Sequence, residues 1–192
     1  MTGLFRTLVL SCSVLALCSC GGYHIRGTVD NEALEGAKIY LVPMFVQDFT
    51  PEMIDSTYIK NLKFSFRGKE EHAADLRIER PRREGVQHLF IITEPGLTNV
   101  VIGADSRSWG TPQNDSIQVY KELCIKHSME CTQLYREGRF RENDSVHFAI
   151  MDRIKQLMRN TGGTTLCNFL ISTNPDLADQ LSKEEGWYEI KR

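Results

Sequence analysis

Two patterns of hydrophobic and polar residues divide the chain near residue 112. Before this point, apolar and polar residues mostly alternate, which is the pattern of a strand with one buried face. After it, apolar residues recur three and four positions apart, which is the pattern of a helix with one buried face. We therefore predict an α+β protein, with an N-terminal antiparallel β-sandwich over residues 20–112 followed by a small α-helical region over residues 113–192.

The pattern changes at residues 109–115 (Trp-Gly-Thr-Pro-Gln-Asn-Asp), whose composition favours a sharp turn. The glycine can adopt backbone angles that other residues avoid, and the proline fixes its own φ. Asn114, Asp115 and Ser116 are all residue types that cap the N-terminus of a helix. We expect one of these three side chains to cap the first helix.

The alternating part predicts about seven short strands separated by turns, as in a β-sandwich. We expect residues 23–30 and 37–41 to form a hairpin, and residues 54–59 and 63–67 to form a second pair. Residues 87–93 contain four consecutive apolar residues, which is typical of a strand covered on both faces. A further strand is expected at residues 99–103.

The second part predicts four helices. The first should end near Gly138 and bury a stripe that includes Cys124 and Cys131. The second should carry its apolar residues between Val146 and Met158 and end at residues 160–163, where two glycines follow Asn-Thr. Two short helices are expected at residues 166–172 and 177–185, and we expect Trp187 and Tyr188 to pack back against the others.

Residues 1–19 have the composition of a signal peptide. Their apolar run of about ten residues matches the hydrophobic segment of a secretory signal and is shorter than the ~20 residues of a transmembrane helix. The run ends in Leu17-Cys18-Ser19-Cys20-Gly21, which resembles a bacterial lipobox. This resemblance implies that Cys20 carries fatty acyl chains such as palmitate and attaches the protein to a membrane. The alternative is an ordinary cleaved signal followed by a chance cysteine.

The net charge of the chain restricts the class of partner. Without residues 1–19 the chain has 173 residues and a net charge of −3, because only Arg6 is lost among the charged residues. This balance argues against nucleic acid as a partner. Arg77, Arg80, Arg82 and Arg83 surround a proline, and we interpret them as a solvated loop.

The lipobox also bears on which side of the membrane the protein faces. Residues 21–27 contain no Asp or Glu, whereas surface-exported lipoproteins of the group it resembles usually carry acidic residues just after the lipidated cysteine. We therefore expect a place in the cell envelope, on the periplasmic face of the outer membrane.

The spacing Cys124-x-x-His127-x-x-x-Cys131 places three metal-ligating residue types on one helix face. Residues seven apart are about 10.5 Å apart along a helix axis, which is too far for both thiols to reach one ion or to form a disulfide. We therefore expect buried, apolar cysteines, with a bridge from either one to Cys167 left open. The other histidines (24, 72, 88 and 147) are scattered, and we predict no metal and no cofactor.

Six short segments together have a recognisable pattern: residues 23–29, 38–41, 54–56, 63–68, 93–96 and 110–115. They resemble a domain of unknown function that precedes thioredoxin-like modules in lipoprotein thiol-disulfide oxidoreductases of gut anaerobes and their relatives. The resemblance implies the fold of that domain. It does not transfer the redox activity, because the sequence contains no C-x-x-C pair for disulfide exchange.

Three serines follow an aspartate and precede Thr, Ile or Val: Ser56, Ser116 and Ser145. They resemble the acceptor pattern for periplasmic O-glycosylation in the same bacteria. The local alternative is turn and helix-cap chemistry, since two of the three are expected just before helices. The two roles are compatible at an exposed cap.

These observations favour a non-catalytic, lipid-anchored binding or interaction module whose partner is another envelope protein. The sequence contains neither a G-x-S-x-G elbow nor a glycine-rich phosphate loop, so we name no catalytic residue. One alternative is an accessory subunit that works with a separate thioredoxin-like protein. The other is a catalytic domain with a polar site that the sequence does not reveal.

Overall fold

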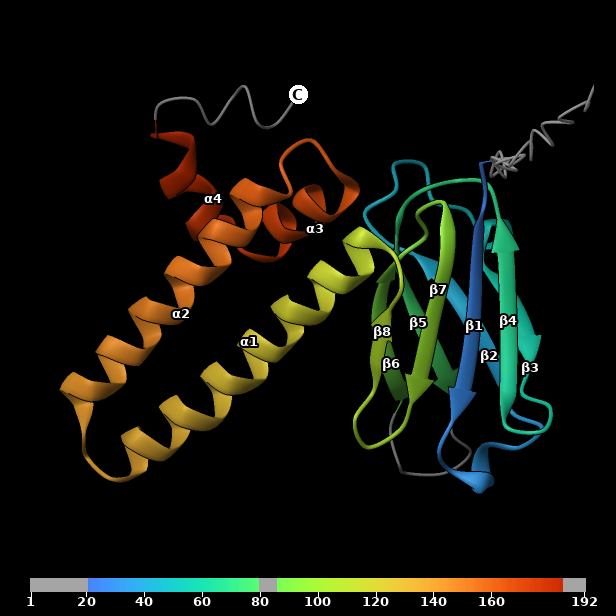
Figure 1. Ribbon diagram of the computed structural model, residues 1–192, viewed down its shortest axis with the longest axis horizontal. Coiled ribbons are helices and arrows are strands. Elements are labelled where there is room, and N and C mark those ends of the chain that lie inside the picture. Colours follow the sequence, from blue (N-terminus) through green and yellow to red (C-terminus); the bar gives the residue numbers. More distant parts are fainter. Residues whose placement is uncertain (1–20, 80–85, 185–192) are drawn as a thin grey trace, which may run out of the picture.

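The computed structural model describes residues 21–79 and 86–184, which form eight strands followed by four α-helices (Figure 1). The strands make two four-stranded sheets, in the orders β4-β1-β7-β8 (sheet A) and β3-β2-β5-β6 (sheet B). The predicted α+β class is confirmed. The strand bounds are β1 Tyr23–Val29, β2 Lys38–Pro43, β3 Asp55–Tyr58, β4 Lys63–Gly68, β5 Ala73–Glu79, β6 Val86–Ile92, β7 Gly96–Ile102 and β8 Arg107–Trp109.

Strand pairing is antiparallel except between β1 and β7, which run parallel. The predicted hairpins are wrong. β1 pairs with β4 and β7, whereas β2 pairs with β3 and β5 in the other sheet. Likewise, β3 and β4 belong to different sheets. Alternation specifies which side chains point to the core, and two successive strands satisfy it equally well across the core or side by side.

The sandwich core lies between the two sheets. Its fully buried residues include Ile25, Ile39, Leu76 and Ile91. Gly27 is required there by close packing, because a Cβ at this position would lie 1.9 Å from the Phe64 ring. β5 and β8 were not predicted, and they complete the two sheets.

The helical region contains a long hairpin and two short helices: α1 Pro112–Arg136, α2 Phe140–Asn160, α3 Thr165–Thr173 and α4 Pro175–Ser182. The hairpin of α1 and α2 extends away from the sandwich, and α3 and α4 lie at its base (Figure 1). Its turn contains Gly138 at φ +71°, a conformation that favours glycine. The four expected helices are therefore present, while Trp187 and Tyr188 lie outside the described residues. None of the helices within the described ranges is both long and apolar enough to span a membrane.

A second core joins the helices to sheet B. It contains Ile117, Ile154, Met158 and Leu170 from the helices, and it takes in Ala73 and Ile92 from the outer face of sheet B. The predicted stripe on α1 is only partly right. Ile117 and Leu123 are buried, whereas Cys124, Cys131 and Leu134, in the part of the hairpin that extends away from the sandwich, are half-buried.

Asn114 attaches α1 to the edge of sheet B. Its side chain is fully buried, and its Oδ1 accepts a hydrogen bond from the Ile92 backbone N–H at 3.0 Å. Its Nδ2 donates to the Ile92 carbonyl at 2.7 Å, so the amide pairs with β6 as a neighbouring strand would. The same Nδ2 also lies 2.9 Å from Thr111 Oγ1 and 3.2 Å from Thr98 Oγ1. The first turn of α1 thereby supplies hydrogen-bond partners for the backbone N–H and carbonyl of Ile92, at the end of the edge strand.

The N-terminus of α1 is capped from a distance. Glu94 Oε1 accepts hydrogen bonds from the backbone N–H groups of Gln113 at 2.7 Å and Asn114 at 3.0 Å. The expected cap by Asn114, Asp115 or Ser116 is therefore wrong. Thr111 occupies the N-cap position and its side chain makes no capping hydrogen bond, while Asp115 accepts from the Gly110 N–H instead. A buried carboxylate stabilises the positive end of the helix dipole here.

Candidate binding surface

The outer face of sheet B has a covered end and an open end. At the covered end, Ala73 and Ile92 are buried beneath the helices and Met44 is partly buried there. The rest of this face carries side chains that point away from the sandwich core, as strand alternation and register require. We call this surface the open face; its residues are Lys38, Tyr40, Val42, Ser56, Tyr58, Asp75, Arg77, His88 and Phe90.

Aromatic side chains are prominent on and beside the open face. Tyr58 is 55% exposed and Phe90 is 44% exposed. At the border with the helices, the Phe169 ring lies 5.8 Å from that of Phe90 and 6.0 Å from that of Phe45, which is itself 58% exposed. Exposed apolar groups gathered in this way are typical of binding surfaces.

A polar cluster lies on β5 and β6 within the open face. Asp75 is buried although it points outward, because the longer side chains beside it cover it. Its Oδ2 lies 2.6 Å from His88 Nδ1, 3.3 Å from Arg77 Nη2 and 3.4 Å from Arg77 Nε. Its Oδ1 is buried and has no hydrogen-bond partner within residues 21–79 and 86–184. The carboxylate thereby holds the two partly exposed side chains in place.

The chemistry of this cluster fits binding better than catalysis. Asp75 accepting from Nδ1 would leave Nε2 of His88 as a hydrogen-bond acceptor directed away from the carboxylate. The serine on this face, Ser56, sits on β3, three strand positions from His88 on β6. At about 4.8 Å per strand this separation is roughly 14 Å, far beyond the reach of a nucleophile and base that share a proton.

A cavity of about 520 Å³ adjoins the open face at its helical border. It is lined by residues 44–47, residues 71–73 and α3, including Phe45, His72 and Phe169. Burial lowers the pKa of His72, and the nearby Glu70 partly opposes that shift. Phe45 has φ +56°, a left-handed conformation that is rare for a bulky residue and is often found at functional sites.

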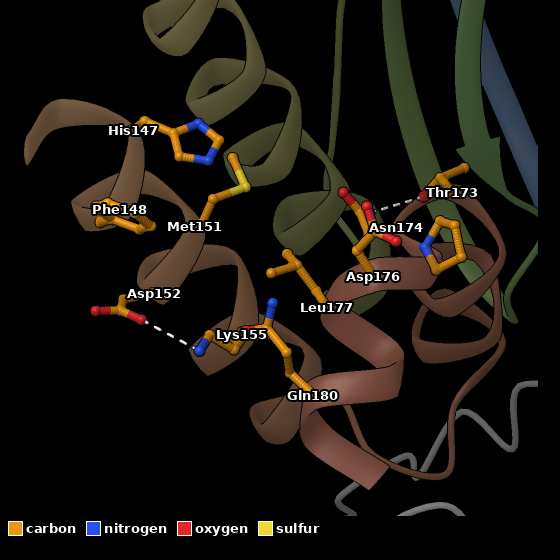
Figure 2. Close-up of a pocket in the computed structure, with 11 residues that line it drawn as sticks. His147, Phe148, Met151, Asp152, Lys155, Thr173, Asn174, Asp176, Leu177 and Gln180 are labelled. Carbon is orange, nitrogen blue, oxygen red and sulfur yellow. Dashed lines mark hydrogen bonds and ion pairs between the residues drawn. The ribbon is translucent and has the colours of Figure 1, made fainter. Parts of the chain in front are cut away.

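A second cavity, of about 360 Å³, lies between α2 and the start of α4 (Figure 2). His147, Phe148 and Met151 line it from α2, while Asn174 and Asp176 line it from the other side. Several of its polar groups are already engaged with neighbours. Lys155 pairs with Asp152 at 3.4 Å, and Asn174 Nδ2 donates to Tyr120 Oη at 3.2 Å and to the Leu170 carbonyl at 2.9 Å. The open face is therefore the stronger candidate.

The three serines of the glycosylation-like pattern are far apart in the fold. Ser56 is half-buried on β3, Ser116 is half-buried within α1, and Ser145 is exposed within α2. The expectation that two of them precede helices is wrong, because Ser116 and Ser145 lie inside helices that begin at Pro112 and Phe140. Ser145 Oγ donates to the Arg141 carbonyl at 3.0 Å, a bond within its own helix.

The cysteines are arranged differently from the expectation. Cys124 and Cys131 are half-buried, not buried, and Cys167 is buried with its Sγ 3.6 Å from the Met158 carbonyl. Within the described part of the chain these three form no disulfide with one another. Burial raises the pKa of both the Cys124 and the Cys131 thiols, and Glu130 adds to the effect at Cys131. The described residues also include no group of three or more His, Cys, Asp or Glu side chains placed to hold a metal ion.

Two other expected sites lie wholly or partly outside the described ranges. Cys20 precedes residue 21, and Arg80, Arg82 and Arg83 fall in residues 80–85. The prediction of a solvated loop is wrong for Arg77. This residue lies on β5, and its Nη2 is 3.3 Å from Asp75 Oδ2.

Sequence reasoning missed the main residues of the open face. The signal in β5 was Asp75, a single acid among Ala73, Ala74 and Leu76. In β6 the alternation of buried and exposed residues is hidden in the sequence. Phe90 and Ile92 both point outward and are both apolar, Ile92 because the helices bury it, so the strand resembles a continuous apolar run.

Comparison with known proteins gives a match for the N-terminal part. Residues 23–117 match a family described as a domain of unknown function (DUF4369). The match covers the whole sandwich and reaches into α1, so it includes both Glu94 and Asn114. No match was found among curated proteins or among solved structures. The expected resemblance to a domain of unknown function is confirmed, and the description of the family names no activity.

Proposed function

We propose that this carrier of a domain of unknown function is a non-catalytic, lipid-anchored envelope protein that binds another envelope protein through its open face. The observation that carries the proposal is the uncovered part of sheet B, where Tyr58 and Phe90 are exposed around the polar cluster of Asp75, Arg77 and His88. Tyr, Phe and Arg are enriched in the centres of protein interfaces, and an ordered polar group among them adds specificity.

A lipid on Cys20 would determine which end of the sandwich faces the membrane. Cys20 is three residues before Tyr23, the first residue of β1, so the tether is at most about 10 Å long. The Gly96 N–H donates to the Gly22 carbonyl at that end, and the loop after β2 lies there too. The hairpin of α1 and α2 points away from this end (Figure 1). The strands would then stand upright on the membrane, with the open face turned sideways toward neighbouring proteins.

The absence of catalytic activity is supported by the arrangement of reactive groups. His88 lies across the sheet from Ser56, and the raised pKa values of Cys124 and Cys131 disfavour the thiolates that disulfide exchange requires. We expect the purified protein to be inactive in an insulin-reduction assay with dithiothreitol. Activity that disappears in a variant lacking Cys124, Cys131 and Cys167 would contradict this part of the proposal.

The alternative, an accessory subunit that docks a separate thioredoxin-like protein, uses the same surface. It is favoured by the resemblance of the sandwich to domains that precede thioredoxin-like modules. In this form, the partner supplies the redox chemistry and the open face supplies the contact.

Photo-crosslinking in intact cells tests the proposal. A photoreactive amino acid would replace Tyr58 or Phe90 on the open face, with Thr28 and Ser65 as matched exposed positions on the outer face of sheet A. We expect a discrete adduct from the first two positions and none from the control positions. A thioredoxin-like protein in the adduct would favour the alternative, and any other envelope protein would favour the main form. Equal adducts from both sheets, or none from the open face, would overturn the proposal.

Cell fractionation tests the anchor separately. Cys20→Ala should move the protein from the membrane fraction to the soluble periplasmic fraction, because lipid attachment is lost while the folded part is unchanged. Protease added to intact cells should leave the wild-type protein uncut if it faces the periplasm. Retention of Cys20→Ala in washed membranes would show that the anchor assignment is wrong.

A further inference from the structure

Two histidines meet across the helical hairpin. His127 is half-buried on α1 and His147 is exposed on α2. His127 Nε2 lies 2.9 Å from His147 Nδ1, and the ring planes are inclined at 55°. The ring centres are 5.1 Å apart, so both nitrogens lie close to the line that joins the two rings. The contact therefore brings together two imidazole nitrogens, the type of atom that transition metals prefer among neutral protein ligands.

We propose that His127 Nε2 and His147 Nδ1 form a two-histidine site for a transition-metal ion of the Cu²⁺, Ni²⁺ and Zn²⁺ class. Imidazole nitrogens bind such ions at about 2.0–2.1 Å, so two of them on adjacent coordination positions lie roughly 3 Å apart. The observed separation of 2.9 Å already matches that spacing. To bind, the rings swing so that both lone pairs point at the ion, and the imidazole that now donates the bridging hydrogen changes tautomer, so that its proton is carried on its other ring nitrogen.

The surroundings favour two protein ligands completed by water. Cys124 and Cys131 are one turn from His127 on the same helix, yet the described residues include no group of three or more His, Cys, Asp or Glu side chains placed to hold one ion. On α2, His147 lines the cavity of Figure 2, and the ring of Phe148 lies 5.4 Å from its ring. That cavity gives water access to the side of the site. The metal-like spacing in the sequence thus gains its second ligand from α2 and not from a cysteine.

An ion at this position would connect the two helices of the hairpin. His127 and His147 are twenty residues apart in sequence, so the unfolded chain does not hold them together. Metal that binds only the folded hairpin raises its stability by mass action. The inference is independent of the partner proposed for the open face, since it concerns a different element and is tested on the purified protein.

Titration with Ni²⁺ tests the site. The mature protein, purified without a histidine tag, would be titrated calorimetrically at pH 7.5, with Mg²⁺ as the control ion. We expect one Ni²⁺ per chain and no response to Mg²⁺. His127→Ala and His147→Ala should each weaken Ni²⁺ binding at least tenfold, and the double variant should be no weaker than the singles. His24→Ala, on β1, is the matched control and should bind Ni²⁺ as the wild type does.

Thermal unfolding provides a second measurement. Ni²⁺ should raise the unfolding midpoint of the wild type and of His24→Ala, and it should leave the midpoints of His127→Ala and His147→Ala unchanged. Circular dichroism without metal should be the same for all four proteins, because neither histidine belongs to a core. Ni²⁺ binding that is weakened less than tenfold by His127→Ala or His147→Ala, or that falls equally in His24→Ala, would overturn the proposal, as would the absence of stoichiometric binding.

Discussion

The β-sandwich and the helical region differ in how each buries its apolar residues. Among the described residues, the sandwich core consists of residues from the strands and the segments that connect them, from Tyr23 to Ile102. The helical core needs the outer face of sheet B, from which it takes Ala73 and Ile92. The dependence therefore runs one way. The sandwich has a complete core without the helices, whereas the helices complete theirs on the sandwich.

Within the hairpin, the exposure of apolar residues increases with distance from the sandwich. At the base of the hairpin, Ile154 and Met158 are fully buried under α3 and α4. Farther out, Met129 is 69% exposed, and Tyr135 and Phe148 are each 66% exposed. Two helices packed only on each other leave most of their surfaces in water, so local stability should fall toward the turn of the hairpin.

The largest expected effect compares one large-to-small change in each core. Leu76 and Leu170 are both fully buried, one in each core, and each leucine-to-alanine change should lower the free energy of unfolding by about 2–5 kcal/mol. Leu76→Ala should destabilise both regions together, whereas Leu170→Ala should destabilise the helices and spare the sheets. Urea titration followed by NMR amide signals from β1 and α2 would separate the two. Equal loss of β1 signals in both variants would contradict the one-way dependence.

The next effect concerns the connection between the regions. Asn114→Ala would leave the buried N–H and carbonyl of Ile92 without their partner, at a cost of about 1–3 kcal/mol for each group. The helices should then unfold before the sandwich, giving two calorimetric transitions where the wild type has one. Gln118→Ala is the control, because it removes a longer contact to the sheet, from the Ser108 N–H at 3.3 Å, together with an exposed hydrogen bond to Glu122 within α1 at 3.0 Å. A single transition in Asn114→Ala would show that this amide does not couple the regions.

The smallest effect is a pH dependence at the border between the regions. Burial is the main cause of the lowered pKa of His72, so the folded state favours neutral imidazole. The unfolded chain takes up this proton at about pH 6.5. Stability should therefore be complete above that pH and should decrease as the pH falls below it. His72→Gln should show a weaker decrease between pH 7.5 and 5.5 in urea unfolding, and an unchanged slope would contradict the assignment.

The sequence predicted elements better than their arrangement. Most strands and all four helices follow from local periodicity, since strand alternation and helical spacing are properties of neighbouring residues. Strand partners depend on contacts across the core. That is why β1 was wrongly paired with β2, and why the parallel pairing of β1 with β7 was not foreseen.

The candidate site and the helix cap were missed for a related reason. Glu94 caps α1 although two strands, β7 and β8, separate it from the helix in sequence, so no rule about residues near the cap could identify it. Asp75 and His88 are thirteen residues apart and meet only because β5 and β6 are neighbours. His127 and His147 meet only through the packing of α1 on α2. Each of these contacts is tertiary, and none leaves a short-range signal.

Native-state hydrogen exchange of the wild-type protein tests the central claim most directly, because it measures local opening in every element at once. We predict that amides of β1, β2 and β5 exchange only through global unfolding. Amides near the turn of the hairpin, around Tyr135 and Phe140, should exchange at least about tenfold faster through local opening, with protection increasing toward Ile154. Uniform protection along α1, α2 and the central strands would contradict the account, because it would show one cooperative unit in which the helices stabilise the sandwich as much as it stabilises them.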